Sequence, residues 1–260
     1  MSSDAPSSNV VQDDFDPRPG WRLRGYIMVW PAMLWVTLNL ILLLIFALLL
    51  PKLTRKYEIP IIRSWGRVPL AFLGIRVEER GLEYRTSPGA KLLLFNHVNI
   101  FDLLVLASTW TKGSTVIYKK EFHKIPIMGR LLRFFGMISV DRSDRAKAVQ
   151  SLNLAGELIR SEGRSVVMAP EGTRSGTGKL APFKKGPFHL ALQTGVPAVP
   201  MIQRGLSDLA PNGTLFTRSG VVRVQYMEPI PTKDWTRETL DQHMAEVRQA
   251  FLTYCEDGTA

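Results

Sequence analysis

The stretch GMISVDRSDRAKAVQSLNLAGELIRSEGRSVVM (136–168) contains a strand–helix–strand pattern that decides the fold class. Two short apolar runs, at 137–140 and 165–168, have the composition of buried strands. Between them, apolar residues recur at helical spacing, with Ser143 as the candidate N-cap and Gly163 as the candidate end of the helix. Because strands that alternate with helices are typical of α/β proteins, this stretch predicts an α/β fold.

Apolar and β-branched runs elsewhere in the chain extend this pattern. They predict further strands at 91–95, 115–119, 196–202 and 221–226. A last helix is expected at 236–254, where apolar residues repeat on one face. The predicted fold is therefore α/β, with a mixed sheet flanked by helices.

The composition is that of a basic globular chain. The 260 residues are 45% hydrophobic and 22% charged, which excludes a fully disordered protein. The formal net charge is +10, and because residues 1–20 carry −3, the remainder carries +13. This positive field favours anionic partners such as phospholipid headgroups, phosphorylated metabolites or nucleic acid. The single cysteine, Cys255, excludes an internal disulfide and any cysteine-based zinc site.

An uninterrupted apolar segment lies near the N-terminus. In residues 26–50, 22 of the 25 side chains are hydrophobic and none is charged. A helix of this length spans about 37 Å, enough to cross a hydrocarbon core of about 30 Å. We therefore predict a membrane-embedded helical segment here, in preference to a secretory signal or a buried core helix.

The topology of this segment stays open at the level of sequence. Three arginines precede it and four basic residues follow it, and this near balance does not decide an orientation. Pro31 and Asn39 leave open a break into two shorter helices that enter and leave one leaflet. Residues 59–77 mix apolar and basic side chains, which predicts a stretch at the membrane interface.

A histidine and an aspartate follow the predicted strand at 91–95. In NHVNIFD (96–102), His97 and Asp102 have the spacing His-x4-Asp. A loop that enters a helix would let Asp102 accept a hydrogen bond from one ring nitrogen of His97, so that the other nitrogen is free to take a proton. On spacing alone, a structural histidine near a helix start is the simpler interpretation.

A second group, PEGTRS (170–175), directly follows the predicted strand at 165–168. A glycine-containing turn and the guanidinium of Arg174 can form an anion site. A solvated basic loop is the alternative interpretation. The segment GTRSGTGKL (172–180) has neither the spacing nor the Ser or Thr of a P-loop, which argues against a nucleotide triphosphatase. The downstream lysines that extend the positive charge are Lys179, Lys184 and Lys185.

Positive charge also gathers between these two groups. Residues 112–145 hold eight Lys or Arg and three acidic side chains. They lack the interleaved aromatic residues and the groove-entering motifs that nucleic-acid binding requires. Together with the membrane segment, these cations favour lipid phosphate as the partner.

Five segments, in order, resemble the glycerolipid acyltransferases of the 1-acylglycerol-3-phosphate acyltransferase family, which carry an HxxxxD motif. The resemblance is close over about residues 85–205 and extends loosely to the membrane segment. Residues 1–20 are rich in Ser, Asp and Pro without an apolar period, which predicts a disordered tail. The predicted division is therefore a disordered tail at 1–20, a membrane-anchoring helical segment at 21–57 and an acyltransferase domain at 58–260. The five segments are NHVNIFD (96–102), KKEFHKIPIMG (119–129), GMISVDR (136–142), PEGTRS (170–175) and GVPAVP (195–200).

The resemblance also implies roles for single residues. His97 would be the general base and Asp102 its orienting partner. The chemistry of acyl transfer also requires donors to the tetrahedral oxyanion, and backbone amides near His97 are the candidates, although the sequence does not identify them. Residues 196–200 would line the acyl side. Asn99 and Ala169 stand where many members have Ser and Phe, which puts the acceptor or acyl preference in doubt. The implied substrate-binding residues are Asn96, Lys119, Lys120, Arg142, Glu171, Gly172, Thr173 and Arg174, with Arg174 and the lysine pair facing the phosphate.

The implied reaction is acyl transfer from acyl-CoA or acyl-ACP to the free 2-hydroxyl of 1-acylglycerol 3-phosphate, which forms phosphatidic acid. No metal, cofactor or nucleic acid is implied. The implied partners are membrane phospholipids, the lysophospholipid acceptor, and coenzyme A or acyl carrier protein as donor carrier. The implied location is a membrane, the bacterial inner membrane, with the active site facing the cytoplasm.

Two alternatives stay open. The first keeps the chemistry and changes the acceptor to glycerol 3-phosphate, another lysophospholipid or a lyso-aminolipid. The second is a membrane protein that binds phospholipid without catalysis. Binding alone needs only the basic groups, so the presence of both His97 and Asp102 favours an enzyme.

Overall fold

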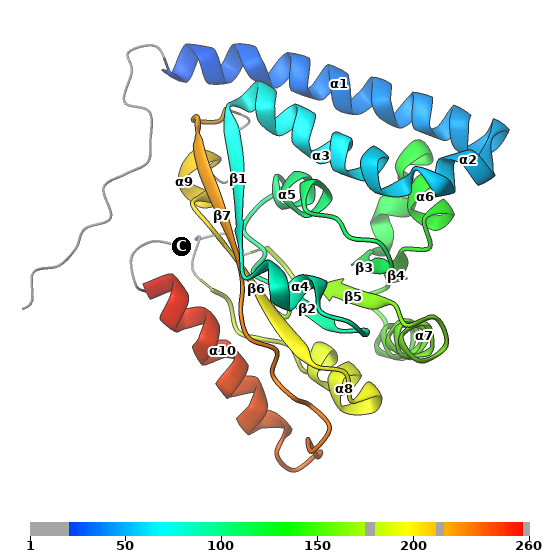
Figure 1. Cartoon of the computed structure of the whole chain (residues 1–260), viewed down its shortest axis with the longest axis vertical. Coiled ribbons are helices and arrows are strands. Elements are labelled where there is room, and N and C mark those ends of the chain that lie inside the picture. The colour runs from blue at the N-terminus through cyan, green and yellow to red at the C-terminus, as the bar shows by residue number, and fades with distance from the viewer. Residues whose placement is uncertain (1–20, 175–179, 212–215, 257–260) are drawn as a thin grey trace, which may run out of the picture.

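In the part of the chain that the structure describes, seven strands form one mixed sheet (Figure 1). The computed structural model describes residues 21–174, 180–211 and 216–256, so the predicted tail lies outside the described residues. The strand order is β1-β7-β6-β2-β5-β3-β4, and all strand pairs are parallel except β6 with β7. The strands are β1 (Ile75–Arg80), β2 (Leu92–Phe95), β3 (Ser114–Lys119), β4 (Ile138–Val140), β5 (Ser165–Met168), β6 (Ala198–Arg204) and β7 (Gly220–Tyr226).

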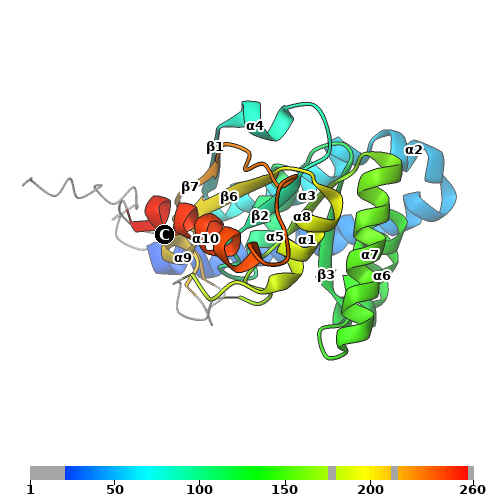
Figure 2. The ribbon, with the colours of Figure 1, turned by 90° about the horizontal axis from the view of Figure 1, so that it is seen from below.

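Helices cover both faces of this sheet. Helices α1, α3 and α5 lie on one face, while α7, α8 and α10 lie on the other and stand in front of the sheet when the molecule is seen from below (Figure 2). The helices are α1 (Trp21–Leu49), α2 (Pro51–Lys56), α3 (Glu58–Leu73), α4 (Leu82–Thr86), α5 (Asp102–Ser108), η1 (Lys120–Lys124, a 3₁₀ turn), α6 (Pro126–Phe134), α7 (Arg145–Glu162), α8 (Lys185–Thr194), α9 (Leu206–Leu209) and α10 (Leu240–Glu256).

The central strands are buried on both faces, as expected for a parallel sheet between two helical layers. In β2, Leu93 and Phe95 pack with α3 and α5, whereas Leu92 and Leu94 pack with α7, α8 and α10. This alternation is why LLLF is a continuous apolar run rather than an alternating one. The predicted α/β fold with a mixed sheet is confirmed, and each of the six predicted strands is present.

The first strand of the sheet was not predicted. The stretch 59–77, predicted to lie at the membrane interface, divides into α3 and the start of β1. Gly74 separates them with a φ of 74°, the left-handed conformation that ends many helices at glycine. Leu70 and Leu73 at the end of α3 are 2% and 1% exposed. The prediction therefore missed both the strand and the buried face of the helix.

Two predicted helix boundaries were also displaced. The N-cap of α7 is Asp144 rather than Ser143, because the Asp144 carboxylate accepts a hydrogen bond from the backbone N–H of Lys147 at 3.1 Å. Ser143 instead donates its hydroxyl to Asp141. The predicted end of α7 at Gly163 is confirmed by a φ of 64° there. The last helix begins at Leu240 rather than at residue 236.

Helix α1 is one continuous helix with an exposed apolar face. It passes through Pro31 and Asn39 without the break that the sequence left open. The segment Leu23–Leu49 is long and apolar enough to cross a membrane. Only 17% of an apolar 18-residue stretch within it is buried, so α1 is not a core helix. Trp30 and Leu48 are 68% and 69% exposed. An apolar surface of this extent normally covers a partner or lies in lipid.

Helix α3 holds α5 through close backbone contact and two arginines. A Cβ on Gly66 would lie 2.3 Å from the carbonyl oxygen of Leu104, so only glycine lets the two helices approach this closely. Arg63 Nε donates to the carbonyl oxygen of Trp110 at 2.8 Å, and Arg67 Nε donates to that of Ser108 at 3.2 Å. These bonds satisfy carbonyls at the C-terminal end of α5.

We expect Gly66→Ala to lower the melting temperature of the purified protein by several degrees. The added methyl must push α3 and α5 apart, and overpacking of this kind costs about 1–3 kcal/mol. Gly186→Ala is the matched control, because a Cβ on Gly186 would meet only the end of the Leu152 side chain, at 3.4 Å. Equal melting temperatures for the two variants in a thermal unfolding assay would contradict close packing at Gly66.

Candidate active site

His97 and Asp102 lie together at the carboxyl end of β2, where the chain passes into α5. His97 Nδ1 and Asp102 Oδ2 are 2.5 Å apart. The same oxygen accepts hydrogen bonds from the backbone N–H groups of Val98 at 2.7 Å and Asn99 at 3.1 Å. Asp102 is fully buried. Since the carboxylate engages Nδ1, the nitrogen left for a substrate is Nε2.

A second buried carboxylate contacts the same loop from the opposite side. Glu171 is 1% exposed, and its Oε1 accepts a hydrogen bond from the backbone N–H of His97 at 2.7 Å. Its Oε2 accepts from the N–H of Ala181 at 2.8 Å. Glu171 therefore ties three chain segments together and is not among the residues that line the cavity described below. The predicted contact between Glu171 and substrate is thus replaced by a contact with the histidine loop.

Burial governs the electrostatics of both carboxyl groups. It raises the pKa of Asp102, while the hydrogen bond and charge of His97 and the two backbone N–H bonds act in the opposite direction. Burial likewise raises the pKa of Glu171, against the N–H bonds from His97 and Ala181. The N–H groups of His97, Val98 and Asn99 are all used by these carboxylates. They are not the free oxyanion donors that the sequence predicted near His97.

The segment 170–174 lies beside His97 and is held by Arg142. The Arg142 guanidinium donates to the carbonyl oxygen of Gly172. Gly172 has a φ of 71°, which favours glycine, and its N–H donates to the carbonyl oxygen of Ala169 at 3.1 Å. Arg142, Thr173 and Arg174 line the cavity, whereas Gly172 shapes the turn without lining it.

The two predicted phosphate-binding lysines have different positions. Lys119, at the end of β3, lines the cavity, and its Nζ is 3.1 Å from Glu121 Oε1. Lys120 is exposed and does not line the cavity; its Nζ is 3.3 Å from Asp141 Oδ2. Hydrogen bonds from Ser143, followed by that from Lys120, lower the pKa of Asp141 to about 2. The structure thus brings Lys119, but not Lys120, to the cavity.

Asn96 and Asn99 are structural rather than exposed to substrate. The side chain of Asn96 is 5% exposed, donates to the carbonyl oxygen of Gln203 at 2.9 Å and accepts from its N–H at 2.7 Å. This pair of bonds fastens the end of β2 to β6, which corrects the predicted substrate-binding role of Asn96. The amide of Asn99 donates to the carbonyl oxygen of Ala210 at 2.7 Å. Neither side chain lines the cavity.

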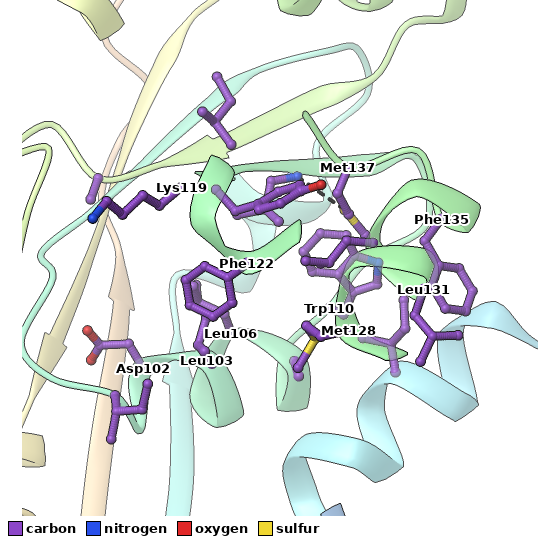
Figure 3. Close-up of a pocket in the computed structure, with 18 of the residues that line it drawn as sticks. Asp102, Leu103, Leu106, Trp110, Lys119, Phe122, Met128, Leu131, Phe135 and Met137 are labelled. Atoms are coloured by element: carbon purple, nitrogen blue, oxygen red, sulfur yellow. Dashed lines mark hydrogen bonds between the residues drawn. The ribbon is translucent and has the colours of Figure 1, made fainter. Parts of the chain in front are cut away.

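An apolar cavity of about 330 Å³ opens beside His97 (Figure 3). Leu103 and Leu106 on α5, and Trp110 two residues after the end of that helix, form one wall. Asp102 and Lys119 lie toward one side of the view, and the deep apolar residues lie toward the other. The other walls come from Leu40 and Leu43 of α1, Ile62 and Trp65 of α3, and Met128, Leu131 and Phe135 from α6 and its C-terminus.

The sequence did not indicate this cavity. Residues 196–200 were predicted to line the acyl side; β6 runs through the core, and none of these residues lines the cavity. The usable signal was the apolar periodicity of 127–135, which gives α6 a strongly amphipathic face. Within the described residues, no group of three or more His, Cys, Asp and Glu side chains is arranged to hold a metal ion.

Known proteins resemble the chain over most of this region. Residues 76–204 match a family model described as Acyltransferase. A 1-acyl-sn-glycerol-3-phosphate acyltransferase of Limnanthes alba is 35% identical over 187 residues, which are 72% of this chain and 66% of that protein. One of Saccharomyces cerevisiae is 33% identical over 193 residues, 73% of this chain and 63% of that protein. The match thus spans slightly less than two thirds of these relatives.

A solved structure shows the same fold. The crystal structure of the 1-acyl-sn-glycerophosphate (LPA) acyltransferase of Thermotoga maritima superposes with a TM-score of 0.77 at 24% sequence identity. The superposition covers 91% of this chain and 97% of that chain. It therefore includes the N-terminal helices as well as the sheet.

Proposed function

Because this chain belongs to the acyltransferase family that includes the 1-acylglycerol-3-phosphate acyltransferases, we propose that it acylates a lysophospholipid at a membrane. The acceptor is 1-acylglycerol 3-phosphate, and the product is phosphatidic acid. The observation that carries the proposal is the position of His97, which is held by the buried Asp102 at the side of an apolar cavity. A non-catalytic lipid-binding protein would not need that pair.

The reaction needs a nucleophile more than it needs an activated acyl group. The donor is a thioester, which is already reactive, so no acyl-enzyme is required. The free hydroxyl of the acceptor is protonated at neutral pH, and His97 Nε2 removes this proton as the oxygen attacks the thioester carbon. Asp102 stabilises the imidazolium. The imidazolium then returns the proton to the thiolate that leaves.

The apolar cavity is the proposed site of the acyl chain. Away from His97, its walls are formed mainly by aliphatic, methionine and aromatic side chains. The α5 wall extends from Asp102 to Leu106, roughly 6 Å at the helical rise per residue, and continues to Trp110 just after the helix. A chain that lies along this wall would have its thioester beside His97. The cavity lies on the membrane-facing side of the sheet, because α1 supplies one wall.

The cations at the same end are the proposed site of the acceptor phosphate. Lys119, Arg142 and Arg174 line the cavity near His97. Arg174 is exposed and presents a planar pair of donors suited to phosphate. Gly172 and Glu171 support this site by shaping the segment that carries Arg174, and Lys120 adds positive charge nearby.

We expect Arg174→Ala to raise the KM for the lysophospholipid by about tenfold while kcat changes little. Loss of one charge-assisted contact to phosphate costs roughly 1.5–3 kcal/mol. Arg160→Ala, which removes an exposed arginine on the far helix α7, is the matched control. A weakened donor KM with an unchanged acceptor KM in steady-state assays would reverse the role of Arg174.

We further propose that α1 lies within one leaflet rather than across the bilayer. Its buried residues Val29, Ala32, Leu43 and Ala47 extend along most of the helix and pack against the folded domain. Helix α3, with its arginines, runs beside it (Figure 1). A helix flanked by a folded domain over its length cannot be surrounded by lipid at its middle. The bilayer would cover only its exposed apolar face.

The location on the bacterial inner membrane and the division at residues 57 and 58 stay predictions that rest on the resemblance. The thioester donors are carried by coenzyme A or acyl carrier protein, and we place the site on the cytoplasmic side because these carriers are found there. Every proposed step uses the residues of the chain and its two substrates, without a metal or a further cofactor.

The test is an assay of the purified full chain in detergent with a panel of acceptors and both thioester donors. We expect phosphatidic acid from 1-acylglycerol 3-phosphate. Product only from glycerol 3-phosphate, another lysophospholipid or a lyso-aminolipid would replace the acceptor and keep the chemistry. Tight lysolipid binding without product from any pair would favour the non-catalytic alternative.

A further inference from the structure

The hydrogen bond between Tyr118 and His123 has no part in the proposed reaction. The Tyr118 hydroxyl and His123 Nε2 are within hydrogen-bond distance, and this bond closes residues 118–123 into a turn. Tyr118 lies on β3 and is 8% exposed, while His123 lies on η1. Burial raises the pKa of Tyr118, so its hydroxyl stays protonated at neutral pH.

The turn 118–123 carries Phe122 into the cavity. Phe122 and Tyr118 both line the cavity, and their rings meet edge to face at a centroid distance of 6.5 Å. In Figure 3, the Phe122 ring lies between Asp102 and Lys119 on one side and Met128 and the deeper apolar residues on the other. Phe122 therefore stands along the proposed path of the acyl chain.

Helix α6 supports the turn from its other side. A Cβ on Gly129 would lie 2.9 Å from the Cα and 3.0 Å from the carbonyl oxygen of His123. The N–H of Ile125 donates to the carbonyl oxygen of Phe122 at 3.1 Å. The turn is thus held between a side-chain hydrogen bond and a helix that leaves it no space to shift.

We propose that Tyr118 and His123 are positioning residues that hold Phe122 in the cavity, where its ring selects acyl chains by their width. This inference rests on the proposed function, since the selected chain is the acyl chain. A straight saturated chain passes beside the ring. A chain with a methyl branch meets it at the branch, and one extra carbon in an apolar pocket typically changes affinity by about tenfold or somewhat more.

The branch position follows from the geometry of α5. Leu106 lies one helical turn after Asp102, roughly 5–6 Å along the helix, and it lines the same cavity as Leu103 and Phe122. The probe chains are therefore palmitic acid and its analogue with a methyl group near carbon 6. Competition of each with a fluorescent fatty acid on the purified full chain gives the ratio of their dissociation constants.

We expect the unmodified protein to bind the branched chain about tenfold more weakly than the straight one. Phe122→Ala should bring the ratio to about two. Tyr118→Phe and His123→Leu should shift it the same way, because each removes one partner of the hydrogen bond. His123→Gln, which retains a hydrogen-bonding nitrogen, should preserve the ratio, as should Lys124→Gln, an exposed control on the same turn.

Gly129→Ala tests the support from α6 with a different change. The added methyl collides with the backbone of His123, so it should also bring the two dissociation constants closer. The same ratio in Phe122→Ala as in the unmodified protein would overturn the inference. A change in Phe122→Ala without one in Tyr118→Phe and His123→Leu would overturn the positioning role. Binding needs no transfer, so selectivity without any product would contradict the proposed function alone.

Discussion

His97→Ala is expected to lower kcat/KM for acyl transfer by about 10²–10⁴-fold, the usual contribution of a general base. The variant removes the nitrogen that accepts the proton of the hydroxyl, and water in the vacated space is a weaker base at neutral pH. The lysolipid and the thioester contact other residues of the cavity. Their affinities should therefore change by no more than a few-fold.

The measurement compares steady-state transfer with direct lysolipid binding in detergent. His189→Ala is the matched control, because His189 is an exposed histidine on α8, on the opposite face of the sheet. Full transfer activity in His97→Ala would remove the catalytic assignment. A loss of lysolipid binding together with a lower melting temperature would instead show that His97 has a structural role.

Asp102→Asn should lower kcat by roughly 10²–10⁴-fold with little change in either KM. An asparagine has nearly the same shape, but its amide replaces one acceptor oxygen with an NH₂ group that can only donate. The carboxylate of Asp102 accepts from His97 Nδ1 and from the N–H groups of Val98 and Asn99. The amide oxygen can accept from these N–H groups only if the NH₂ group points away from them. A neutral amide also cannot stabilise the imidazolium by charge.

A double variant distinguishes a shared role from two separate ones. When two residues act as one unit, the double variant loses far less activity than the product of the two single losses. We expect His97→Ala with Asp102→Asn to be about as inactive as His97→Ala alone. Asp241→Asn, another aspartate in the first turn of a helix, is the control. Multiplicative losses would contradict a role of Asp102 through His97.

The part of the site that sequence could predict is local. His97 and Asp102 are five residues apart, so the end of β2 and the start of α5 suffice to join them. The segment after β5 was recognisable for the same reason, since a glycine and an arginine follow a buried strand directly. Residue identity and short-range geometry determine both features.

The parts that could not be predicted depend on contacts between distant segments. Asn96 has the sequence context of a site residue, yet its partner Gln203 is 107 residues away. Glu171 is equally remote from His97, 74 residues along the chain, and its carboxylate turns inward to that backbone. The cavity requires α1, α3, α5 and α6 to assemble before it exists. No pattern within one segment carries that information.

The strand β1 was missed for a local reason. In its sequence IRVEER the first four residues alternate between apolar and charged, as in an edge strand, but the strand directly follows an apolar helix that ends at Gly74. The apolar run across that boundary conceals the change of period from helix to strand. The glycine was the available signal, and its left-handed conformation separates the two elements.

The position of Leu40 and Leu43 in the cavity wall has a practical consequence for work with this protein. A fragment that lacks the first fifty residues would be an attractive soluble sample, but it would also lack the part of the apolar cavity wall that Leu40 and Leu43 supply. Kinetic constants measured on such a fragment would describe a cavity that is open to water. Nanodiscs or mild detergent, which retain the N-terminal helix, are the preparations in which chain-length preferences have meaning.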